Sequence, residues 1–207
     1  RVGVSRDGTT AYLKLAYHAP AVGDQDFFPM IVLDAILAGA KGINLWSSFR
    51  TPPPQRSARL YRALVERRLT SSVGAGLLPT EHPFLYLISA TAMEGVGLAD
   101  VEAAATGVLD ATARNGVSDR ELLKAKNQLR ARLVFENDSV TNIGHQLGYY
   151  ETVASLELYR DAPGRIAGVT ASDAQVAAAV RFAFEELKLV VEPGGAIGLA
   201  ALLAGSL

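Results

Sequence analysis

The sequence contains no cysteine, which removes the whole chemistry of the thiol group. A chain without cysteine forms no disulfide, offers no thiolate nucleophile and cannot build a cysteine-rich zinc site. Long apolar runs are missing as well, because no stretch approaches the ~20 consecutive apolar residues of a membrane-spanning helix. The sequence therefore predicts no transmembrane segment, and it leaves only oxygen and nitrogen groups for any catalysis or metal binding.

An excess of charge of one sign is also absent. The 20 Lys and Arg residues are spread along the chain and nearly balance the 21 Asp and Glu residues, so that the net charge is −1. Nucleic-acid binding needs a concentrated basic face, and the sequence predicts no nucleic-acid partner. With 207 residues, of which 49% are hydrophobic, the chain is long enough and apolar enough to bury a core.

The chain begins at Arg1, without a methionine and without a signal-peptide pattern. We interpret it as a fragment, so that any targeting segment would lie outside this sequence. The residues alone do not predict a compartment.

Local patterns predict one domain over residues 1–207 that starts and ends with strands. Alternating and apolar segments predict strands at 9–18, 69–77, 84–92 and 187–191. Helical patterns occupy 24–38, 57–67, 98–114, 118–136, a segment from about 138, a shorter piece broken at Pro163-Gly164, and 170–185. Asp24 or Asp26 caps the first of these and Ser57 the second, and a capping box of Ser118 and Glu121 opens the helix at 118–136. This order predicts an α+β fold with a mostly antiparallel sheet and helices on one face.

The three histidines do not form a metal-binding pattern. None of His18, His82 and His145 lies three or four residues from another, as a helical zinc motif requires. A His-x-x-Glu-His motif ending at His82 would need histidine at position 78, which is Leu78. The sequence therefore predicts no metal site in this chain.

The sequence also contains no recognisable motif for a catalytic nucleophile or for a general acid or base. No Gly-x-Ser-x-Gly elbow is present, and Ser71-Ser72 has no base that the sequence reveals. The carboxylates stand where surface or capping roles suffice, as at Asp34, Glu66, Glu94, Glu136 and Glu151. The sequence predicts no catalytic residue.

Three stretches nevertheless resemble the second half of a zinc peptidase of the pitrilysin/insulinase family, which includes the mitochondrial processing peptidases. They read AYLKLAYHAPAVGDQDFFPMIVLDAILAGA, SARLYRALVERRLTSSVGAG and DRELLKAKNQLRARLVFENDSVTNIGHQLGYYETV. The resemblance implies one half of a clamshell, in which the other half carries His-x-x-Glu-His and binds zinc. This half would need no cofactor of its own, would pair with that catalytic domain or subunit, and would help to hold a peptide substrate.

The resemblance also suggests where substrate would be held. Active members often supply an Arg and a Tyr, seven residues apart, and these positions fall at Leu64 and Ser71 here. We take Ser71, Ser72, Arg67 and Arg68 as candidate substrate-binding residues in their place. Bacterial relatives of the family suggest a periplasmic or cell-envelope location.

Two alternatives stay open. The departures at Leu64 and Ser71 also fit a purely structural subunit with the same fold, like the core subunits of a respiratory complex. The tail, residues 181–207, resembles the end of the catalytic domain of a pyridoxal-phosphate-dependent dehydratase, although the segments that hold that cofactor are missing.

Overall fold

The computed structural model describes residues 10–43, 55–137, 139–171 and 189–191. Within them lies an antiparallel sheet of four strands in the order β2-β3-β1-β4. The strands are β1 (Tyr12–Ala19), β2 (Thr70–Leu77), β3 (Phe84–Ala92) and β4 (Leu189–Val191). The predicted antiparallel pair of β2 and β3 is confirmed, and the predicted last strand is confirmed over its final three residues.

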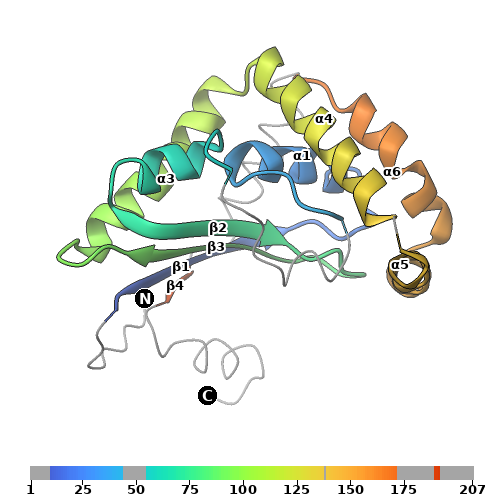
Figure 1. Cartoon of the computed structure of the whole chain (residues 1–207), viewed down its shortest axis with the longest axis horizontal. Helices are drawn as coiled ribbons and strands as arrows, with labels where there is room; N and C mark the ends of the chain where they lie inside the picture. Colours follow the sequence, from blue (N-terminus) through green and yellow to red (C-terminus); the bar gives the residue numbers. More distant parts are fainter. Residues whose placement is uncertain (1–9, 44–54, 138, 172–188, 192–207) are drawn as a thin grey trace.

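The two faces of this sheet differ in character. Leu13, Leu15 and Tyr17 of β1 are buried, whereas Tyr12 and Lys14, which alternate with them, are exposed. Figure 1 shows α1, α3, α4 and α6 above the sheet and α5 beyond one end of it. The described helices therefore cover one face, as the α+β prediction requires, and the alternation of β1 identifies that face as the core.

The helix next to the sheet is α1 (Phe27–Leu37), and every one of its residues is buried. It contacts β2 on one side and α4 and α6 on the other, which explains why its sequence is apolar all round. The predicted caps were wrong: Asp26 makes no side-chain cap bond, and Asp24 instead accepts a hydrogen bond from the Ala21 N–H at 2.8 Å.

The outer helices are α3 (Leu98–Asn115), α4 (Asp119–Glu136), α5 (Val140–Val153) and α6 (Leu156–Gly168). None of the helices in the described part of the chain is both long and apolar enough to span a bilayer. The predicted capping box of α4 is confirmed, since Ser118 and Glu121 exchange side-chain and backbone hydrogen bonds.

Two predicted helices differ from the structure. The segment 57–67 contains η1 (Tyr61–Val65), a π-helical turn in which the Glu66 N–H donates to the Tyr61 carbonyl, five residues earlier. The helix α6 continues through Pro163 and is not broken there. Proline costs about 3 kcal/mol inside a helix, and the burial of Leu158, Tyr159, Ala162 and Ile166 in α6 offsets that cost. The predicted helix 170–185 lies almost entirely outside the described residues.

Candidate functional site

The four candidate substrate-binding residues lie close together at one end of the edge strand β2. Arg67 and Arg68 follow η1, and Ser71 and Ser72 are among the first residues of β2. All four are exposed. Arg68 has a φ of 59°, a left-handed conformation that side chains other than glycine rarely adopt, and it turns the chain from η1 into the strand.

The two serine hydroxyls both contact β3. Ser71 Oγ donates to the Thr91 carbonyl at 3.3 Å, and Ser72 Oγ lies 3.1 Å from Thr91 Oγ1. A β-bulge between Thr70 and Ser72 puts both serines opposite a single partner residue. The one proton of Ser71 is therefore engaged with the sheet, which leaves its oxygen available to a ligand as an acceptor.

Leu64, the other position that the resemblance marks, is fully buried. It belongs to the core cluster and lies on the covered side of η1. Its side chain packs inside the protein and does not reach a substrate.

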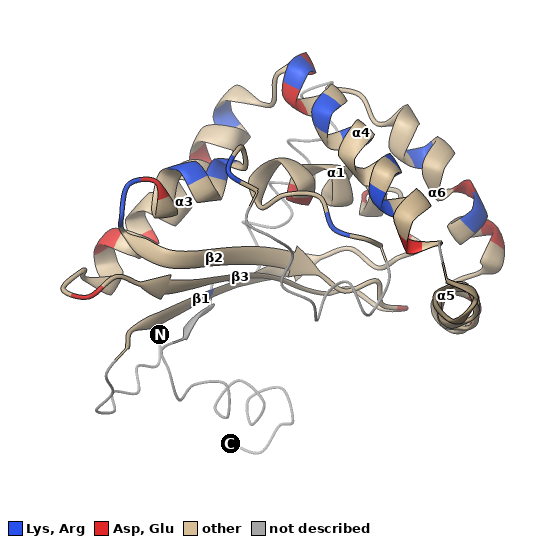
Figure 2. Cartoon of the chain, in the orientation of Figure 1, with Lys and Arg blue, Asp and Glu red and all other residues tan. Residues whose placement is uncertain are grey.

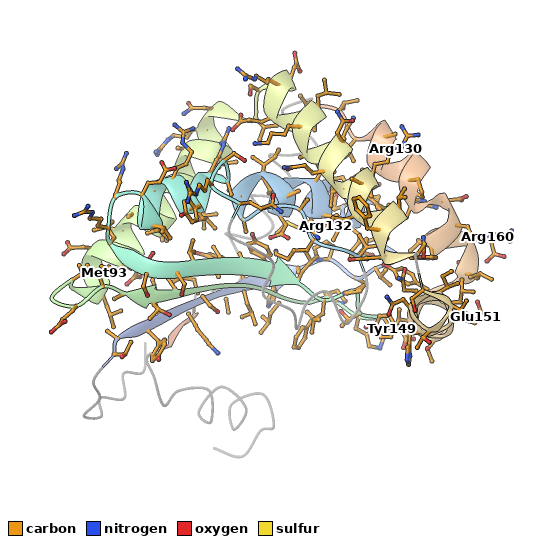
Figure 3. All side chains as sticks on the ribbon, viewed as in Figure 1. Met93, Arg130, Arg132, Tyr149, Glu151 and Arg160 are labelled. Atoms are coloured by element: carbon orange, nitrogen blue, oxygen red, sulfur yellow. The ribbon has the colours of Figure 1, made fainter. Side chains whose placement is uncertain are left out.

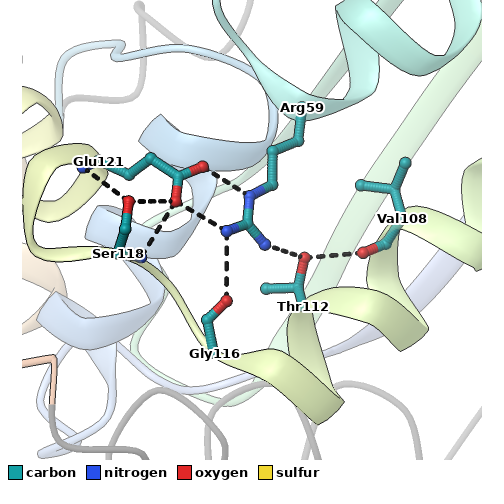
Figure 4. A network of polar contacts seen from close by, with 6 residues as sticks. All are labelled: Arg59, Val108, Thr112, Gly116, Ser118 and Glu121. Atoms are coloured by element: carbon teal, nitrogen blue, oxygen red, sulfur yellow. Dashed lines mark hydrogen bonds and ion pairs between the residues drawn. The ribbon is translucent and has the colours of Figure 1, made fainter.

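A polar network holds this end of the protein in place (Figure 4). Arg59 donates to Glu121 Oε1 at 2.8 Å and Oε2 at 2.9 Å, to Thr112 Oγ1 at 2.8 Å and to the Gly116 carbonyl at 3.2 Å. These bonds join the segment before η1 to the turn between α3 and α4. The hydrogen bond from Arg59 is the main reason why the pKa of Glu121 is lowered from 4.5 to about 2.

A second polar cluster lies between α1 and the covered face of the sheet, around Asp34 of α1. Lys41 Nζ donates to Asp34 Oδ2 at 2.6 Å and to the Ala75 carbonyl of β2, and the Tyr86 hydroxyl donates to Asp34 Oδ1 at 3.0 Å. Burial raises the pKa of Asp34 above its ordinary value, and Lys41 and Tyr86 oppose this shift. Sequence reasoning missed the cluster, because α1 ends between Asp34 and Lys41, and Tyr86 lies on a strand 52 residues after Asp34.

The three histidines lie on different segments of the chain. His18 is half-buried on β1, His82 is exposed in the turn before β3, and His145 is exposed on α5. Among the described residues, no group of three or more His, Asp or Glu side chains could hold a metal ion. The donor set of this part of the chain therefore does not fit a zinc site.

The described residues thus form an α+β unit with helices on one face of its sheet and a buried helix α1 next to that face. Residues 1–129 match the Peptidase M16 inactive domain, and the chain belongs to that family. No curated protein matches the chain.

Solved structures share the fold. The "inactive peptidase domain of a putative zinc protease" from Bordetella parapertussis is 23% identical, with a TM-score of 0.73 over 93% of this chain and 96% of that chain. A protease from Helicobacter pylori is 17% identical, with a TM-score of 0.77 over 91% of this chain and 42% of that one. A peptidase M16 inactive domain from Pseudomonas fluorescens is 20% identical, with a TM-score of 0.71 over 89% of this chain and 40% of that one.

Proposed function

We propose that this domain pairs with a zinc-binding catalytic domain of the same family and helps to enclose and hold peptide substrates. The observation that carries the proposal is the match to an inactive peptidase domain, together with the length of the related chains. This chain spans 42% of the Helicobacter pylori protease, which leaves room there for a second unit of similar size.

The face of the sheet that the described helices leave uncovered, here called the open face, supports the holding role. The register places Ser72, Thr91 and Tyr12 side by side across β2, β3 and β1, and Gly74, Ser89 and Lys14 form the next row. Of these six residues, five are exposed and Thr91 is half-buried. The members of these rows on β2 and β3 are small, which allows an extended peptide to approach those two strands closely, next to the exposed Arg67 and Arg68.

The chemistry of bond cleavage is assigned to the partner. When bound there, zinc would polarise a water molecule that attacks the peptide bond. The described residues of this chain would form one side of the substrate chamber and supply hydrogen-bonding groups, and we assign them no proton transfer. We also propose a periplasmic or cell-envelope location, which cell fractionation tests.

The experiment is co-expression of this chain with a His-x-x-Glu-His protein of the family from the same genome. We expect the two to co-purify, with stoichiometric zinc and peptidase activity that neither shows alone. Replacing the glutamate of that motif by glutamine should abolish activity and keep the complex. One zinc held tightly by this chain alone would contradict the proposal.

A structural subunit is the second candidate, and the state of Leu64 and Ser71 favours it. Leu64 is buried and the Ser71 proton is engaged, so neither reproduces the Arg and Tyr donors of active members. If the complex forms and holds zinc, but Ser72→Trp on the open face leaves peptide cleavage unchanged, the structural role is the correct one.

A further inference from the structure

The helix α4 has an outer face that no described element covers. Its inner face, with Leu122, Ala125, Leu129 and Leu133, is buried against the rest of the protein. Figure 1 shows α4 as the outer ridge of the helical layer, on the far side of α1 from the sheet. The outer face therefore points away from the open sheet face that holds substrate in our proposed function.

Large apolar side chains are exposed along this face. Leu123 is 61% exposed, Val134 68% and Phe135 73%, and Val140 at the start of α5 is 87% exposed. In an α-helix, Leu123 and Phe135 are separated by about 18 Å, so these side chains do not form one compact cluster. Single exposed apolar residues are common and by themselves indicate no binding surface, so the charges that lie between them decide what this face can bind.

The charged residues in the middle of the same helix are all basic, and its acidic residues lie at the two ends. From Leu122 to Phe135, α4 carries Lys124, Lys126, Arg130 and Arg132 and no acidic residue. Figure 2 shows these basic positions as blue bands between acidic ends. Lys126 donates to the Ala167 carbonyl at 2.8 Å and so helps to attach α6, whereas Lys124 and Arg130 are exposed beside the apolar residues.

We propose that the outer face of α4 docks onto an anionic lipid surface. Surfaces that lie in a membrane interface combine Lys and Arg, which meet lipid headgroups, with apolar side chains that enter the boundary of the acyl chains. A protein partner is less suitable, because protein interfaces are built around a compact apolar centre, and here the apolar residues are spread along the helix. A lipid surface accepts each apolar side chain separately.

The test is sedimentation of the whole chain with vesicles of phosphatidylcholine alone or with 30% phosphatidylglycerol. We expect binding to the anionic vesicles, little binding to the neutral ones, and loss of binding at high salt. Because each basic residue near such a surface contributes about a fivefold gain in binding, Lys124→Glu with Arg130→Glu should weaken binding at least 25-fold. Val134→Ser with Phe135→Ser should weaken it about tenfold.

Matched controls separate this face from general charge and apolarity. Arg62→Glu with Arg114→Glu makes the same change in net charge at exposed sites outside α4, and it should leave most of the binding intact. Met93→Ser removes an exposed apolar side chain at the end of β3, far from Arg130 (Figure 3), and should have no effect. Thermal melts verify that each variant is folded.

Three results would each overturn the proposal: no vesicle binding by the parent chain, equal binding to neutral and anionic vesicles, or undiminished binding by the Lys124 and Arg130 variant. Capture of an acidic protein by this face, without vesicle binding, would assign it to a protein partner. Pairing with a zinc-bearing domain is measured separately and does not depend on the outcome.

Discussion

At the scale of single residues, the buried charge of Asp34 determines the local arrangement. Asp34 is 6% exposed on a helix that is otherwise entirely apolar, and a carboxylate in such a place must be paired or protonated. Lys41 supplies the opposite charge and also binds the Ala75 carbonyl on the edge strand. One side chain thus connects α1, the turn after it and β2.

Lys41→Met should destabilise the domain by about 3–5 kcal/mol, because it leaves a buried carboxylate without its cation. Urea denaturation at pH 7 measures the loss. The double variant Asp34→Asn with Lys41→Met removes both charges and should lose less than Lys41→Met alone. A single variant as stable as the parent would show that the ion pair does not exist in solution.

Arg68 is a second residue with a distinct local effect. Its left-handed backbone costs about 1 kcal/mol for any residue other than glycine, so glycine at this position would remove the cost. Part of that gain is lost, because glycine makes the unfolded chain more flexible. Arg68→Gly should therefore raise the free energy of unfolding by about 0.5 kcal/mol. Arg67→Gly, at the neighbouring exposed residue without a positive φ, should lower it by about 1 kcal/mol. The two melting temperatures should move in opposite directions.

At the scale of secondary-structure elements, the junction between α3 and α4 depends on ionised Glu121. It accepts bonds from Arg59 and from the Ser118 N–H and hydroxyl, so one carboxylate both caps α4 and attaches the segment before η1. The pKa of Glu121 is lowered to about 2, chiefly by Arg59. The unfolded chain, in which this pKa is close to 4.5, binds the proton more readily.

This difference gives a pH dependence of defined sign. The contribution of Glu121 to stability is fully present above about pH 5 and is lost as the pH falls through the interval from 4.5 to about 2. Because the side chain is 36% exposed, solvent screening limits its contribution to about 1 kcal/mol. Glu121→Gln should lose this amount at pH 7 and should differ little from the parent near pH 2.

Guanidinium denaturation from pH 7 to pH 2 measures the free energies of unfolding of the two proteins, which should become equal as the pH falls. Arg120→Met, which removes an exposed charge from the same turn of α4, serves as the control and should leave the pH dependence unchanged. A constant gap between Glu121→Gln and the parent at every pH would show that the charge of Glu121 is not the cause.

At the scale of the whole molecule, residues far apart in the chain complete the sheet. The strand β4 pairs with β1 from Lys14↔Val191 to Ala16↔Leu189, across more than 170 positions of sequence. Without β4, the backbone groups of β1 would be exposed along an edge of the sheet, and exposed edges pair with other chains. The three residues of β4 therefore belong to the same sheet as β1.

A chain that ends at residue 171 should be less stable than the parent and should self-associate, which light scattering and thermal melts measure. A chain that ends at Val191 keeps β4 and is the matched control, which should remain close to the parent in both measurements. Equal behaviour of the two truncated chains would show that β4 does not protect β1.

The sequence by itself determined features that arise from neighbouring residues. The strands at 69–77 and 84–92, the capping box at Ser118 and the buried stripe of α4 depend on local spacing, so their patterns were sufficient to predict them. The order of these elements was also sufficient for the α+β class and, with the resemblance, for the peptidase family. The substrate-binding role of Ser71, Ser72, Arg67 and Arg68 stays a prediction.

Only the tertiary structure decided the features that join distant residues. The bonds that Asp34 accepts from Lys41 and Tyr86, the bonds of Arg59 across the α3–α4 turn and the contact of Thr91 with two serines all join separate elements. The continuity of α6 through Pro163 belongs here too, because packing against neighbouring helices outweighs a local preference. Such contacts depend on how the chain closes upon itself, and local periodicity contains no information about that closure.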